Sequence, residues 1–146
     1  MNRLSFSLVV CLLVVATSAC GSDTAAPRAT IAGNYVATQW VTTGGSGQTN
    51  QLLAGSTLEL ALASNGTTSG HLHVAASGSN PALDADMAGT WTQSNDKVTV
   101  SQVADTFVRN LTLNVVPNGS RWSLTADQVI SNTRIQLTLD QVFALN

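Results

Sequence analysis

His71 and His73 are the only histidines of the 146-residue chain, and one residue separates them. In a β-strand, residues two apart share a face, so the two imidazoles could approach one zinc ion, with Asp84 and Asp86 a loop away in the sequence. However, apolar residues such as Leu72 alternate with the histidines, and the face that carries these apolar residues is expected to be the buried one. The histidines are therefore expected to face solvent, and we predict two polar exterior residues and no metal site.

Other catalytic arrangements find little support in the sequence. A hydrolase needs a nucleophile, a base and an orienting acid, and His71 and His73 are the only bases of the usual type. The serines and threonines alternate with apolar residues, as outward strand positions do, and none lies in a nucleophile motif. Glu59 is the only glutamate and has no obvious carboxylate partner. We expect no catalytic residues, no cofactor and no enzymatic activity.

The strand that carries the histidines belongs to a predicted β-hairpin over residues 56–76. Leucines fall at every second position on the first strand, from Leu58 to Leu62, and Leu72 and Val74 do so on the return strand. Asn65-Gly66 lies between the two runs, and an Asn-Gly pair is typical of a type I′ turn. The leucine and valine face of this hairpin is therefore expected to be buried.

The same alternation recurs to the end of the chain and predicts six more strands, with Asn118-Gly119 as a second Asn-Gly turn. They cover residues 33–42, 86–93, 97–103, 107–116, 121–130 and 134–143. Sequential antiparallel strands usually pair with their neighbours, and closure of the sheet removes its two edges. We therefore predict an all-β fold, an eight-stranded antiparallel up-and-down barrel, with a β-sandwich as the alternative.

The interior of an eight-stranded barrel is either filled by side chains or holds one small ligand. The residues predicted to point inward are mostly bulky, which favours a packed interior. They are Leu58, Leu60, Leu62, Leu72, Val74, Trp91, Val98, Val100, Leu111, Leu113, Val115, Trp122, Leu124, Ile135, Leu137, Leu139 and Phe143.

The longest break in the pattern is Thr43–Gly55, whose apolar centre, Leu52 and Leu53, is predicted to fold inward as a lid. Arg109 falls on the inward face of its strand by alternation, where it caps the core over an aromatic ring or meets a ligand carboxylate. Four aromatic residues either line a ligand cavity or close the core, although the face of the first strand is ambiguous. They are Tyr35, Trp40, Trp91 and Trp122.

The chain begins with one basic residue, Arg3, and an apolar run over residues 4–16, as a signal peptide does. The run is shorter than the roughly 20 residues of a transmembrane helix. Thr17-Ser18-Ala19-Cys20 then resembles a bacterial lipobox, although leucine is commoner than threonine at its first position. The resemblance implies cleavage before Cys20 and lipidation of its thiol. The alternative is ordinary secretion with a free thiol.

This resemblance divides the chain into a signal peptide (1–19), a flexible tether (20–30) and one domain (31–146). The residue after the cysteine is Gly21, and by analogy with lipoprotein sorting it implies that the exported protein is anchored in the outer membrane and faces the periplasm. Cys11 leaves with the signal, so no disulfide is expected. From Cys20 onward the chain has five Lys or Arg against eight Asp or Glu, so we expect a membrane partner only through the lipid and no nucleic acid. The sequence gives no indication of the oligomeric state.

Three short motifs occur in a fixed order along the predicted barrel. Gly33-Asn34-Tyr35 opens the first strand, the hairpin turn lies within Leu60–Thr67, and Gly89-Thr90-Trp91 opens a later strand. This order resembles bacterial lipocalin-like domains of the calycin type, with Tyr35 in place of the usual tryptophan. The resemblance implies a barrel that often binds an apolar small molecule and has no catalytic residues. We expect a lipid-anchored envelope protein that binds such a ligand, or alternatively a structural or partner-binding lipoprotein with a fully packed core.

Overall fold

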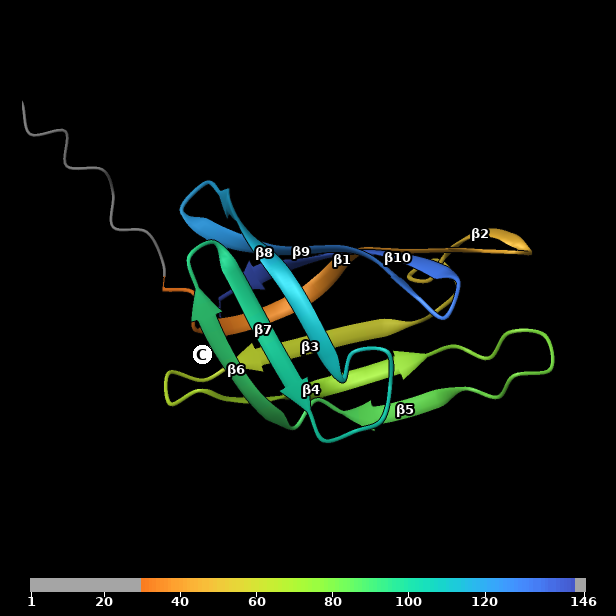
Figure 1. Cartoon of the computed structure of the whole chain (residues 1–146), viewed down its shortest axis with the longest axis horizontal. Helices are drawn as coiled ribbons and strands as arrows, with labels where there is room; N and C mark the ends of the chain where they lie inside the picture. Colours follow the sequence, from red (N-terminus) through yellow and green to blue (C-terminus); the bar gives the residue numbers. More distant parts are fainter. Residues whose placement is uncertain (1–29, 144–146) are drawn as a thin grey trace, which may run out of the picture.

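The computed structural model describes residues 30–143, which form ten β-strands (Figure 1). The predicted signal peptide, Cys20 and nearly all of the tether lie outside these residues. Within them there is no helix that is long and apolar enough to cross a membrane. The strands are β1 (Gly33–Gly44), β2 (Gly47–Asn50), β3 (Thr57–Leu62), β4 (Thr67–Val74), β5 (Leu83–Asp86), β6 (Gly89–Ser94), β7 (Lys97–Gln102), β8 (Asn110–Asn118), β9 (Arg121–Ile130) and β10 (Thr133–Val142).

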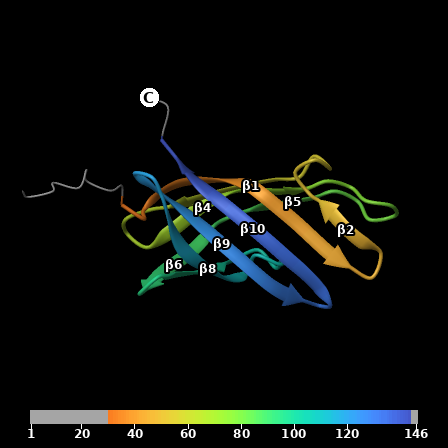
Figure 2. The same ribbon diagram turned by 90° about the horizontal axis from the view of Figure 1, so that it is seen from above.

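Eight of the strands close into an antiparallel barrel. The order around the wall is β1, β3, β4, β6, β7, β8, β9 and β10, and β10 pairs again with β1. The closing pair runs from Asn34 opposite Val142 to Thr43 opposite Arg134, and Figure 2 shows the two strands side by side. The predicted all-β up-and-down barrel is confirmed. The sandwich alternative is excluded because one hydrogen-bonded sheet continues around the whole circle.

A β-bulge in β1 settles which of its residues face inward. The register against β10 shifts between Ala37 and Gln39, so Thr38 is an extra residue. A bulge moves the following side chains to the other face. Tyr35 and Trp40 differ in parity, yet both are 1% exposed. Simple alternation could not place both of them in the core.

Two strands were not expected. β5 pairs with β4, and β2 pairs with the end of β1, so Thr43–Gly55 is not one loop. Its first half is a β-hairpin and its second half a short turn, closed by the Ser56 N–H donating to the Gln51 carbonyl at 2.9 Å. The inward lid is wrong for Leu53, which is 87% exposed because this turn directs it outward. Leu52 is half-buried and packs against the core.

The hairpin turns differ from the predicted type. Gly66 has a positive φ of 85° but Asn65 does not, and the Gly66 N–H donates to the Ala63 carbonyl. This is the pattern of a type I turn followed by a glycine bulge, so the predicted type I′ turn is wrong here. The type I′ pattern of two positive φ values occurs instead between β9 and β10, at Ser131 (48°) and Asn132 (65°).

Two glycines allow the sheet to bend where β4 changes its partner from β6 to β5. Gly70 has a φ of +130°, and a Cβ atom there would lie 2.2 Å from the Glu59 carbonyl oxygen. A Cβ atom on Gly89 would lie 2.1 Å from the carbonyl oxygen of Ser101. Backbone therefore approaches backbone at both positions, and no larger residue fits without movement of a strand.

The core differs from the predicted inward set at a few positions. Phe143 is 63% exposed, beyond the end of β10, where the Arg121 guanidinium lies 4.0 Å from its ring centroid. Arg109 also points outward, because β8 begins only at Asn110 and alternation does not extend into the preceding loop. Val74, Trp91, Val115 and Trp122 are half-buried, while Tyr35, Trp40, Met87, Val108 and Ala126 join the buried core.

Candidate functional site

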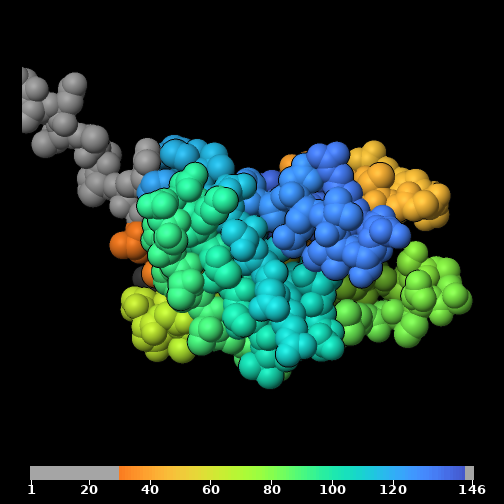
Figure 3. Space-filling view, viewed as in Figure 1, coloured from red at the N-terminus to blue at the C-terminus, as the bar shows by residue number. Residues whose placement is uncertain are grey.

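The two ends of the barrel are built differently. The first described residues, the end of β10 and the tight turns after β3, β6 and β8 lie at one end, which we call the closed end. The longer connections 51–56, 75–82 and 103–109 lie at the other, the open end, together with the β9–β10 turn. Figure 3 shows the β4–β5 loop (light green) and the β9–β10 region (blue) projecting at the open end on either side of a notch.

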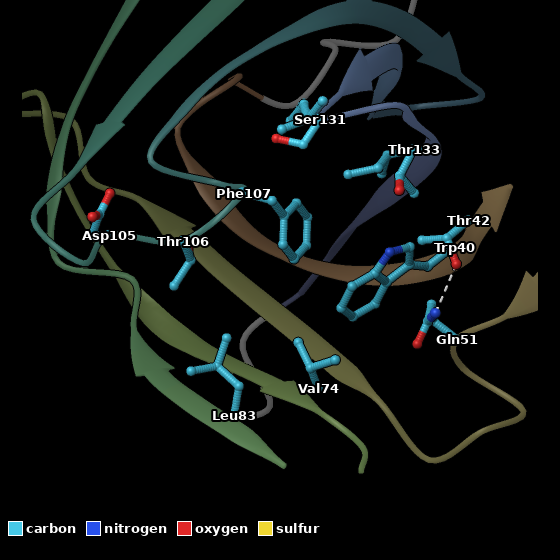
Figure 4. A pocket seen from close by; sticks show the side chains of 12 residues that line it. Trp40, Thr42, Gln51, Val74, Leu83, Asp105, Thr106, Phe107, Ser131 and Thr133 are labelled. Carbon is cyan, nitrogen blue, oxygen red and sulfur yellow. Dashed lines mark hydrogen bonds between the residues drawn. The ribbon is translucent and has the colours of Figure 1, made fainter. Parts of the chain in front are cut away.

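At the open end there is a pocket of about 550 Å³, which we call the mouth pocket (Figure 4). It lies where the wall opens. β8 pairs with β9 only up to Thr125, and the rest of β9 pairs with β10 alone. The connection 103–109, which leads from β7 to β8, brings Phe107 against Trp40, with ring centroids 5.4 Å apart. Its lining residues are Trp40, Thr42, Gln51, Val74, Leu83, Asp105, Thr106, Phe107, Ile130, Ser131, Thr133 and Ile135.

Most of the lining surface is apolar, and the neutral polar lining residues include Thr42 and Gln51. Gln51 donates through Nε2 to the Thr42 hydroxyl at 2.7 Å, which fixes both side chains on one wall. Asp105 is the single charged residue that lines the pocket in the described part of the chain, and it accepts from Arg109 Nη1 at 2.9 Å. Both members of this ion pair are more than half exposed, so the pair lies at the rim and the interior of the pocket is uncharged. Such a pocket suits an apolar molecule.

The structure brings only one of the predicted ligand-binding residues into the mouth pocket, namely Trp40. Arg109 lies outside at its edge, where it pairs with Asp105 rather than capping an inward ring. Leu52 and Leu53 belong to the neighbouring turn but do not line the pocket.

The other predicted aromatic residues lie towards the closed end. The Tyr35 hydroxyl donates to the Ile31 carbonyl at 2.6 Å, and burial raises the pKa of this phenol. Trp91 donates through Nε1 to the Ala63 carbonyl at 2.8 Å. Trp122, at the start of β9, packs half-buried against the core. These three side chains close the core at the end opposite the mouth pocket.

Sequence reasoning missed Phe107 as a pocket residue. Alternation predicts Phe107 as the first residue of a strand over 107–116, whereas it lies in the 103–109 connection and β8 begins only at Asn110. The cluster Ala104-Asp105-Thr106 indicates a turn, but it does not show how far the turn extends. The length of the irregular segment after it depends on where β8 finds its partner.

The histidines lie on the outer wall. His71 faces Asp86 and His73 faces Asp84 across the β4–β5 pair. Both imidazoles contact the same oxygen of Asp84, His73 through Nδ1 at 2.8 Å and His71 through Nε2 at 3.1 Å. These two hydrogen bonds, that of His73 first, hold the pKa of Asp84 below its usual value. The predicted outward position is confirmed, and the part of the chain that the structure describes has no group of three or more His, Cys, Asp or Glu arranged to hold a metal ion.

Comparison of the chain with protein-family models, with curated proteins and with solved structures gave no match.

Proposed function

We propose that this protein is a lipid-anchored, non-enzymatic β-barrel of the bacterial cell envelope that binds a small apolar ligand at its open end. The observation that carries the proposal is the mouth pocket. Its volume of about 550 Å³ falls within the range of about 300–1,000 Å³ that is usual for small-molecule sites. Trp40 and Phe107 give it an aromatic wall, and its aliphatic lining residues are Val74, Leu83, Ile130 and Ile135.

The anchor is proposed from the lipobox resemblance at Cys20 and the residue that follows it, Gly21, which favours the outer membrane. Thr30, the first described residue, enters the barrel at the closed end. Thr30 lies ten positions after Cys20, a stretch that spans at most about 35 Å when extended. The tether therefore joins the barrel at the end opposite the mouth pocket and leaves the pocket unobstructed.

A partner-binding lipoprotein is the second candidate. Several large apolar side chains near the open end are exposed, namely Leu53 (87%), Val103 (80%), Val129 (68%) and Leu83 (43%). A protein partner that covers them would also cover the mouth pocket. Under this alternative, the pocket would be part of a protein interface and would hold no small molecule.

The proposal is tested by titrating the neutral fluorescent probe N-phenyl-1-naphthylamine into the chain from Gly21 to Asn146. This segment contains every strand of the closed barrel, so we expect it to fold without its lipid. We expect saturable binding that Val74→Trp abolishes, because the larger side chain occupies the pocket. Val116→Trp is the matched control, since Val116 lies on β8, is 41% exposed and does not line the pocket. Absence of saturable binding, or equal loss in both variants, would contradict ligand binding at this site.

Lipidation has its own test. The intact mass of the protein purified from bacterial membranes should correspond to a chain that begins at Cys20 and carries acyl groups. Cys20→Ser should remove these groups. A mass that corresponds to an unmodified Cys20 would refute the lipobox interpretation.

A further inference from the structure

Two buried donor atoms in the barrel have no hydrogen-bond acceptor. Among the side chains that the structure describes, they are Trp40 Nε1 and Gln128 Nε2. The Trp40 side chain is 1% exposed. More than nine-tenths of buried polar groups in native proteins are paired, because an unpaired donor loses its bonds to water without replacement. Two unpaired donors in so small a barrel therefore require an explanation.

Both donors lie on the inner wall beside the mouth pocket. Gln128 on β9 is directly opposite Ile135 on β10, which is opposite Thr42 on β1. Trp40 lies one row deeper, opposite Leu137. Directly paired residues of antiparallel strands point to the same face, so Gln128 points inward with Ile135. Figure 4 shows the indole of Trp40 beside Phe107, with its nitrogen on the side that faces Thr133.

Gln128 also lies in the part of β9 that has separated from β8, since the β8–β9 pairing ends at Thr125. Gln128 does not itself line the pocket, but two of its neighbours do, namely Ile130 on the same face of β9 and Ile135 opposite it on β10. A ligand in the pocket therefore reaches the Gln128 amide once the side chains that cover this amide move aside.

The charges around the pocket limit what such a ligand can be. Among residues 30–143, no lysine or arginine lines it, and its single charged residue is the acidic Asp105 at the rim. A buried carboxylate needs a cationic partner or a full set of donors. A neutral oxygen, by contrast, is satisfied by one or two N–H groups and leaves no charge buried.

We propose that the ligand is a neutral, mainly apolar molecule with a carbonyl oxygen, and that Trp40 Nε1 and Gln128 Nε2 donate hydrogen bonds to this oxygen. The proposal rests on the proposed function and specifies the ligand class of the same site. The apolar body of the ligand lies against Phe107 and Ile135. A neutral ester, ketone or amide fits this description, whereas a free fatty acid does not.

The test uses three compounds with the same number of carbon atoms: butyrophenone, butylbenzene and 4-phenylbutanoate. Each competes with N-phenyl-1-naphthylamine for the chain from Gly21 to Asn146. We expect the carboxylate to compete least. Gln128→Met preserves length and shape but removes the donor, and should weaken butyrophenone about tenfold, as expected for loss of a buried hydrogen bond, while butylbenzene changes less than about twofold. Trp40→Phe should act in the same direction.

Thr99→Val is the matched control, because Thr99 is an exposed residue of β7 that does not line the pocket, and its replacement should leave the ratio of the two affinities unchanged. A second readout is the indole N–H resonance that disappears in Trp40→Phe, which should shift with butyrophenone and much less with butylbenzene. If the three compounds bind but Gln128→Met affects ketone and hydrocarbon equally, or the carboxylate binds best, the carbonyl assignment is wrong while the pocket stands. If none of them binds to the unsubstituted chain, the proposed function itself fails.

Discussion

Replacement of Phe107 by alanine should change two measurable properties, the stability of the barrel and the affinity of the mouth pocket. Phe107 lies in the 103–109 connection, is half-buried, and contacts Trp40 with a centroid distance of 5.4 Å. Full burial of such a side chain is worth about 1.5–3 kcal/mol, and an aromatic pair adds about 0.5–1.5 kcal/mol. Since Phe107 is only half-buried, we expect Phe107→Ala to lower the free energy of unfolding by about 1–2 kcal/mol.

The same substitution removes one aromatic wall of the mouth pocket. Loss of about 1.4 kcal/mol of contact corresponds to about tenfold weaker binding of an apolar probe. The assay pairs thermal unfolding, followed by circular dichroism, with titration of N-phenyl-1-naphthylamine. Thermal unfolding is expected to begin well above the temperature of the titration, so weaker binding can be read as a local effect.

Phe143→Ala is the matched control for this prediction. Phe143 is a phenylalanine at the closed end, 63% exposed and in contact with the Arg121 guanidinium. We expect a change of less than about 1 kcal/mol in stability, as for an exposed cation–π contact, and unchanged probe affinity. Unchanged binding in Phe107→Ala, or an equal loss in Phe143→Ala, would refute the placement of the site.

Two further predictions concern the barrel itself. Gly89→Ala should destabilise the fold strongly or prevent folding, because its Cβ atom would lie 2.1 Å from a backbone oxygen. Gly45→Ala should be nearly neutral, because the space around Gly45 is open. Urea unfolding compares the two variants, and equal midpoints would contradict the close approach at Gly89. Hydrogen bonds from Arg134 lower the pKa of Asp127, and those from the two histidines lower that of Asp84, so the folded state favours both carboxylates. Their contribution to stability is complete above the ordinary pKa of 3.8 and is lost as the pH falls through the lowered folded values. Asp127→Asn should therefore flatten the acid side of a stability–pH profile, and an unaltered profile would argue against this ion pair.

The architecture was predictable because alternation and turn residues act locally. Leu58, Leu60, Leu72, Val98 and Leu139 are all buried as their parity predicts, and strand order follows from short connections. Closure follows because an open meander would leave two unpaired edges.

The features that escaped prediction depend on contacts between distant parts of the chain. The bulge at Thr38 appears only when β1 meets β10, about a hundred residues away, and it alone brings both Tyr35 and Trp40 inside. The early end of β8–β9 pairing likewise leaves room for Phe107 in the wall. No periodicity within β1 or the 103–109 connection indicates the bulge or the point at which β8 and β9 separate. The sequence alone therefore could not place the mouth pocket.

The most direct test of ligand binding is a native mass spectrum of the protein purified from the cells that produce it. A pocket of about 550 Å³ has room for a single small molecule, so we predict one additional discrete mass on the intact protein. This mass should be absent from Val74→Trp and present in Val116→Trp, and the released molecule should be neutral and contain a carbonyl group. A spectrum that shows only the bare protein, from cells and after incubation with butyrophenone, would contradict the account.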